Sequence, residues 1–93
     1  MTFAPYEKRI AYAASIAAPT IPEKMIPSYK TGFNGIKWIS MREQEGVNIV
    51  KKLTGRDVPL MVDPTLLLNP ENWKKVSHQP PWYHGGKYIL TYF

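Results

Sequence analysis

Apolar residues gather in four short runs along the chain. The runs are "RIAYAAS" (9–15), "IKWISMR" (36–42), "PLMVD" (59–63) and "KYILTYF" (87–93). Each has the length of a strand and is almost continuously apolar, which is typical of strands covered on both faces. The pattern therefore predicts four short strands.

Helical patterns separate these runs. In "EQEGVNIVKKLTG" (43–55), Val47, Val50 and Leu53 fall near one face, and Gly55 can end the helix. In "NPENWKKV" (69–76), an asparagine can cap a short helix whose first position is proline, and its tryptophan is expected to pack inward.

The gap between the first two runs is less regular. Thr20 and Glu23 have the spacing of a capping box, and Pro22 suits a first helical turn. Because Pro27 opposes one unbroken helix, we expect a short turn and then a second helical piece that ends near residues 32–35.

Alternating strands and helices imply right-handed βαβ units. The predicted fold class is α/β: a three-layer, Rossmann-like arrangement with a mainly parallel sheet of about four short strands and helices on its faces. We expect residues 1–76 to form a partial Rossmann-like domain, 77–86 ("SHQPPWYHGG") a linker, and 87–93 the first strand of a following domain. Because the sequence stops on a bare apolar strand, we expect it to be a piece of a longer protein.

Composition narrows the possible functions. With 93 residues, 44% hydrophobic and 20% charged, the chain has room for one small domain. The absence of cysteine excludes disulfides, thiolate zinc sites and cysteine nucleophiles, and it suits a reducing compartment. No signal peptide and no apolar run long enough to span a bilayer is present, so a cytoplasmic location is expected.

The net charge of +5 favours anionic partners. However, lysines occur as pairs at 51–52 and 74–75 on predicted helices, where a solvated helix face explains them. The sequence has no basic stripe with interleaved aromatic residues, so nucleic-acid binding is not predicted. His78 and His84 lie in the predicted linker without a second ligand at metal-binding spacing, so neither a metal nor a cofactor is predicted. Walker, G-x-G-x-x-G and nucleophile-elbow patterns are also absent.

Polar residues follow three of the predicted strands. In parallel sheets the carboxyl ends of the strands share one rim, where ligands bind. The candidates for binding substrate are Ser15, Ser40, Arg42, Glu43 and Asp63. The guanidinium of Arg42 could clamp a phosphate or carboxylate beside a helix N-terminus, or it could simply pair with a neighbouring carboxylate. Asp63 precedes proline and could hold the turn or contact ligand, and Ser15 could cap a turn or bind ligand.

The joint order of these motifs resembles the polysaccharide pyruvyl transferase family. The resemblance rests on "IAYAAS", "WISMREQEGVNIVKKLTG", "VDPTLLLNPENWKKVS" and "KYILTYF", which together cover nearly the whole chain. It departs after Ser15, where the family often has glycine and this chain has Ile16-Ala17-Ala18.

The resemblance implies a two-domain architecture like that of B-type glycosyltransferases. It also implies transfer of pyruvate from phosphoenolpyruvate to two hydroxyls of a sugar or glycan acceptor, as a ketal, in exopolysaccharide or cell-surface glycan synthesis. Arg42 would then help to hold the donor's phosphate or carboxylate, and Asp63 would organise the neighbouring rim. No catalytic acid can be named in this chain.

Two alternatives remain open: a non-catalytic α/β module that binds an anion or assembles with a partner, and a related B-type glycosyltransferase. The residues do not decide whether the longer protein is an enzyme. The 93-residue chain by itself is expected to be inactive. We also expect self-association through its exposed strand edge and uncovered apolar surface.

Overall fold

The computed structural model describes residues 4–92, so residues 1–3 and Phe93 of the predicted last strand lie outside the described part. The elements in chain order are η1 (Tyr6–Lys8), β1 (Ile10–Ala14), η2 (Glu23–Met25), α1 (Ile26–Asn34), β2 (Trp38–Met41), α2 (Gln44–Thr54), η3 (Pro64–Leu67) and α3 (Pro70–Val76), where η marks a 3₁₀ turn. The fold is mixed α/β, as predicted.

The sheet has two strands, and the prediction of four was wrong. Strands β1 and β2 are parallel, with Ile10 opposite Trp38 and Ala14 opposite Met41. The third apolar run contributes a single parallel bridge between Met41 and Leu60. The ladder stops there because Pro59 has no N–H to donate and because β2 itself ends at Met41.

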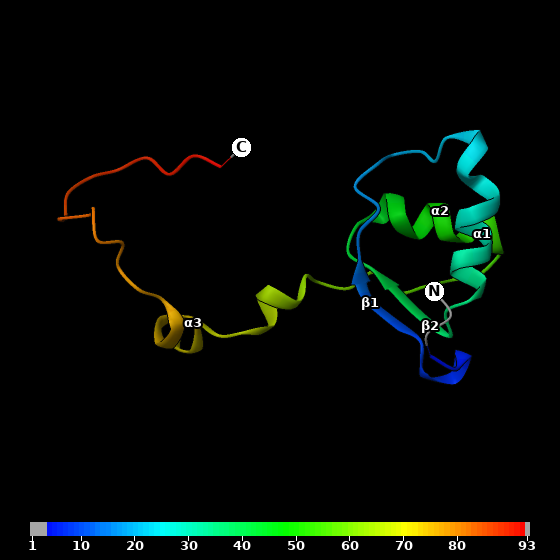
Figure 1. Cartoon of the computed structure of the whole chain (residues 1–93), viewed down its shortest axis with the longest axis horizontal. Helices are drawn as coiled ribbons and strands as arrows, with labels where there is room; N and C mark the ends of the chain where they lie inside the picture. Colours follow the sequence, from blue (N-terminus) through cyan, green and yellow to red (C-terminus); the bar gives the residue numbers. More distant parts are fainter. Residues whose placement is uncertain (1–3, 93) are drawn as a thin grey trace.

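The fourth apolar run, described as far as residue 92, forms no strand. Ile89 and Leu90 are 91% and 84% exposed. A strand needs a neighbour for its backbone hydrogen bonds, and none lies beside this segment (Figure 1). Apolar composition alone therefore overpredicted strands.

Strand β1 contains an irregularity where it approaches its carboxyl end. The register shifts between Ala11 and Ala14, and Ala13 has a left-handed φ of 46°. The N–H of Ala13 donates to Ser40 Oγ at 2.8 Å, so the backbone group released from the ladder is satisfied by a side chain of the neighbouring strand.

The core lies between the sheet and the two longer helices. Ile39, Met41 and Val50 are buried together, with Phe33 of α1 and Val47 of α2 against them. Figure 1 shows both helices packed beside the sheet. In the described part of the chain these helices cover one face only, whereas helices on both faces had been predicted.

The other face is open. We use that term for the side of the sheet lined by Ile10, Tyr12, Trp38 and Met61, which bound a shallow groove of about 580 Å³. Trp38 is 63% exposed and Ile10 is 68% exposed. The continuous apolar pattern of these strands thus corresponds to one buried face and one exposed apolar face.

Most of the local helix signals were read correctly. Gly55 follows α2 with a φ of 74°, and its N–H donates to the carbonyl of Lys51. Asn69 caps α3 by accepting from the N–H of Asn72 at 3.0 Å. As predicted, a short turn precedes α1, and Pro27 stands in that helix's first turn instead of interrupting it. Thr20, however, caps nothing, because η2 begins after Pro22 with no side-chain cap.

Residues 62–92, the C-terminal arm, extend away from the α/β unit (Figure 1). The radius of gyration is 18.4 Å, against about 12 Å for a compact domain of this length. Trp73 on α3 is 42% exposed and does not pack into the core, because its indole N–H instead donates to the carbonyl of Thr65 within the arm. Among the described helices, none has both the length and the apolar character needed to cross a bilayer.

Candidate functional site at the sheet rim

The carboxyl ends of the strands meet at one rim, as the parallel arrangement predicts. The N–H of Arg42 donates to the carbonyl of Ala14 at 3.0 Å, which ties the end of β2 to the end of β1. On the other side, the N–H of Met61 donates to the carbonyl of Met41 at 2.7 Å. These backbone bonds bring the polar residues that follow each strand into one neighbourhood.

Arg42 lies at the centre of the rim. Its Nη1 donates to Asp63 Oδ2 at 2.7 Å, and its Nε is 4.0 Å from Glu43 Oε2. The guanidinium side chain is 44% exposed, so solvent screens both interactions. Since the fork of a guanidinium carries five donors, one bond to Asp63 leaves further donors for an anion in solution.

Asp63 has two roles at once. Its Oδ1 accepts from the backbone N–H of Thr65 at 2.9 Å and from the Thr65 hydroxyl at 2.7 Å, which fixes the start of η3. Its other oxygen holds Arg42. These bonds from Thr65, and then the charge of Arg42, lower the pKa of Asp63. The turn-holding role that the sequence suggested is therefore present, together with an orienting role toward the guanidinium.

Glu43 binds the loop that follows β1. Its Oε1 accepts from the N–H of Ile16 at 2.7 Å, from the Ser15 hydroxyl at 2.9 Å and from the N–H of Ala17 at 3.1 Å. The backbone bonds from Ala17 and Ile16, then the Ser15 hydroxyl, and least of all the charge of Arg42, lower the pKa of Glu43. One carboxylate oxygen thus collects three donors.

Ser40 is placed differently from the other candidates. It is buried, and its hydroxyl accepts from the N–H of Ala13 while facing the carbonyl of Ala11 at 3.5 Å. Ser40 therefore supports the irregular turn of β1 beneath the rim. Of the five sequence-predicted residues, four form a connected polar network at the surface: Ser15, Arg42, Glu43 and Asp63.

In a comparison with protein-family models, the chain matches the model described as polysaccharide pyruvyl transferase over residues 1–91. The chain belongs to the polysaccharide pyruvyl transferase family. Searches of curated proteins and of solved structures found no match. Family membership, predicted from the order of the motifs, is confirmed, and the family implies a sugar substrate.

Two arginines of this pyruvyl transferase family chain have structural roles that the sequence pattern did not reveal. Arg56 donates to the carbonyls of Phe33, Ile36 and Lys37 at 2.7–2.9 Å, which satisfies backbone groups in the last turn of α1 and just after it. Arg9 donates to the carbonyl of Gly35 at 3.1 Å. The only available signal was their position next to strand or helix ends.

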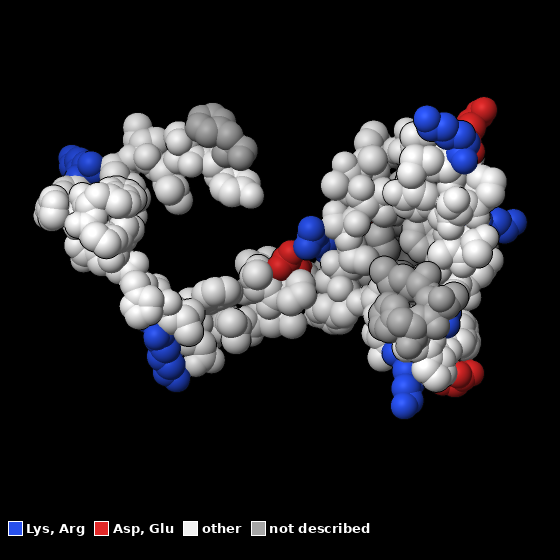
Figure 2. All heavy atoms as spheres, in the orientation of Figure 1, with Lys and Arg blue, Asp and Glu red and all other residues white. Residues whose placement is uncertain are grey.

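The remaining charge is dispersed. On the face seen in Figure 2, Lys and Arg are scattered without forming a stripe, and the C-terminal arm is mainly uncharged. His78 and His84 are exposed. Among residues 4–92 no three His, Asp or Glu side chains come close enough together to hold a metal ion.

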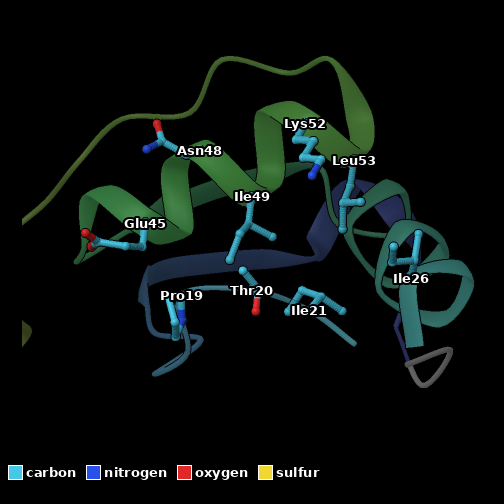
Figure 3. A pocket seen from close by; sticks show the side chains of 9 residues that line it. All are labelled: Pro19, Thr20, Ile21, Ile26, Glu45, Asn48, Ile49, Lys52 and Leu53. Carbon is cyan, nitrogen blue, oxygen red and sulfur yellow. The ribbon is translucent and has the colours of Figure 1, made fainter. Parts of the chain in front are cut away.

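A second hollow, of about 220 Å³, lies away from the rim. Pro19, Thr20 and Ile21 of the loop after β1 face α2 across it (Figure 3). Its lining on the helix side includes Glu45 and Lys52, and the rest is mainly aliphatic. Because this lining contains no arginine, the rim is the better candidate for binding an anionic substrate through two parallel bonds.

Proposed function

We propose that this chain carries part of the donor site of an enzyme that transfers pyruvate from phosphoenolpyruvate to sugar hydroxyls as a ketal, in exopolysaccharide or cell-surface glycan synthesis. Two hydroxyl oxygens of the sugar form bonds to C2 of the donor, and the C2–O bond to phosphate breaks. One hydroxyl proton ends on the methylene carbon, which becomes the methyl group, and the other leaves with inorganic phosphate. The reaction needs groups that hold a carboxylate and a phosphate in place.

The observation that carries the proposal is the placement of Arg42. In a chain of this family, an arginine stands at the carboxyl rim of a parallel sheet, partly exposed and oriented by Asp63. A guanidinium can hold either anionic group of phosphoenolpyruvate through two parallel bonds. Asp63 limits the rotamers of Arg42, so less conformational entropy is lost when an anion binds.

The other predicted contacts fit this assignment to different degrees. The Ser15 hydroxyl donates its one proton to Glu43, so toward a substrate it can only accept, which suits a sugar hydroxyl and not the anionic groups of the donor. Ser40 would act from beneath, through the shape of β1. We propose a cytoplasmic location, in keeping with the absence of cysteine.

One observation favours a second candidate, a non-catalytic α/β module. The guanidinium of Arg42 already has a carboxylate partner, Asp63, at 2.7 Å, and an internal ion pair of this kind needs no ligand. In that case Arg42 and Asp63 would only connect β2 to the start of the C-terminal arm. Ligand titration separates the two candidates.

The test is an NMR titration of the chain with phosphoenolpyruvate, followed through the backbone amides of residues 14–17 and 42–44. Arg42→Ala is expected to weaken binding about tenfold or more, the size of losing a hydrogen-bonded charge partner. Lys74→Ala, which removes one positive charge on α3, is the matched control and should leave the affinity unchanged. Binding that is absent in the wild type, or equal in wild type and Arg42→Ala, would refute the assignment. A response to a nucleotide sugar but not to phosphoenolpyruvate would instead indicate a glycosyltransferase.

A further inference from the structure

The loop after β1 turns its polar backbone groups toward a single carboxylate oxygen. The N–H groups of Ile16 and Ala17 and the hydroxyl of Ser15 all donate to Glu43 Oε1. Ala17 has a left-handed φ of 54°, which is uncommon for a residue other than glycine. Consecutive N–H groups directed at one point in this way form an anion-binding nest. Here the anion is supplied by the chain itself.

The position of Glu43 is a second, independent observation. It stands at the N-cap of α2, where a polar side chain usually accepts from the first N–H groups of its own helix. Its side chain makes no such bond. The carboxylate has turned away from α2 and across to a loop 26–28 residues earlier in the chain.

The second oxygen of the same carboxylate faces Arg42. The distance from Glu43 Oε2 to Arg42 Nε is 4.0 Å. Glu43 therefore spans the space between the loop and the guanidinium, with one oxygen directed to each. Further along, the same loop lies against α2, as Pro19, Thr20 and Ile21 show in Figure 3.

We propose that Glu43 is a positioning residue: its carboxylate fills the nest formed by Ser15, Ile16 and Ala17, and so fixes the loop after β1 as a wall of the anion site at Arg42. The sequence had suggested that Glu43 contacts the substrate directly. The positioning role takes the place of that contact, since a carboxylate would repel an anionic donor. The role toward a ligand rests on the proposed function, whereas the placement of the loop beside Arg42 can be measured without any ligand.

The experiment compares Glu43→Ala, Glu43→Gln and the control Glu45→Ala, which removes a carboxylate only two residues away, in the first turn of α2. In Glu43→Ala the amide protons of Ile16 and Ala17 should move upfield, and the Nε–H signal of Arg42 should shift. Formate added at tens of millimolar should enter the vacated nest and move the Ile16 and Ala17 signals back in a saturable manner. An equal concentration of chloride is the ionic-strength control. A residue with only a general structural role would not give this rescue.

Glu43→Gln keeps the shape and an acceptor oxygen but not the charge, so it provides a folded comparison if Glu43→Ala fails to fold. Its Ile16 and Ala17 signals should move in the same direction by a smaller amount. Phosphoenolpyruvate should bind both Glu43 variants about threefold more weakly or worse, the coupling expected within one network. Unmoved Ile16 and Ala17 signals would overturn the proposal, as would shifted signals with unchanged Arg42 Nε–H and unchanged affinity. If the wild type binds no phosphoenolpyruvate, the proposed function fails, while the ligand-free shifts and the formate rescue still decide whether Glu43 positions the loop.

Discussion

Replacing Gly46 by alanine tests the packing that supports the rim. Gly46 is buried in the first turn of α2, directly against Met41, the residue before Arg42. A Cβ added at position 46 would lie 2.5 Å from Met41 Cε and 3.5 Å from Met41 Cβ and Cγ. Since carbon atoms pack at about 3.5–4.0 Å, the methyl group of Met41 would have to move by about 1 Å. Met41 is 1% exposed, so its side chain can move only if neighbouring core atoms also shift.

Two opposing effects set the magnitude. Alanine in place of glycine favours a helix interior by about 1 kcal/mol. Overpacking a well-filled core costs about 1–3 kcal/mol, and the flexible methionine places this site in the lower half of that range. Gly46→Ala should therefore be neutral to destabilising by about 1 kcal/mol.

Gly32→Ala is the matched control. Gly32 lies within α1, and a Cβ there would meet no atom within 4 Å. This variant should gain the helix preference without the clash and become more stable by about 0.5–1 kcal/mol. Urea unfolding followed by far-ultraviolet circular dichroism gives both free energies, provided that the slope m is unchanged. If Gly46→Ala is stabilised as much as Gly32→Ala, Met41 is not tightly held and the packing argument is refuted.

Two further predictions concern charge and exposed surface. Because the folded state lowers the pKa of Glu43 and of Asp63, it favours their ionised forms, so their contribution to stability is complete near neutral pH and is lost as the pH falls below about 4. Urea midpoints from pH 7 to pH 3 should fall more steeply for the wild type than for Glu43→Gln, and parallel curves would contradict this. The open face should drive self-association, so Trp38→Lys should lower the average mass measured by light scattering at high concentration, whereas Lys74→Ala should not. A wild type that stays monomeric at every concentration would remove the basis for that prediction.

The signals at the ends of α2 and α3 were reliable, and their partners are close in the chain. Asn69 caps α3 through a bond to a residue three positions on, and Gly55 ends α2 through a bond to a residue four positions back. Such contacts depend only on residues within one or two turns. The strand signals failed because "PLMVD" and "KYILTYF" contain apolar residues but no information about a neighbouring strand.

The candidate site was predicted in position but not in its bonding. Parallel strands must place their carboxyl ends together, so Ser15, Arg42 and Asp63 could be assigned to one rim before any contact was known. The destination of the Glu43 carboxylate could not be predicted, because its three donors come from a loop whose backbone takes a left-handed turn at Ala17. Nor could the sequence alone assign Ser40 to the interior or Arg56 to the end of α1.

By itself, the sequence determined the family, the mixed α/β class, the bounds of α2 and the strand ends that meet at the rim, because periodicity, caps and motif order are properties of the chain read locally. The tertiary structure decided which apolar runs became strands and which face of the sheet was covered. It also decided that Glu43 binds a loop and that Asp63 binds Arg42. The physical reason is that β1, Glu43 and Arg42 each have a partner more than 20 residues away in the chain, and only folding brings that partner within hydrogen-bonding distance.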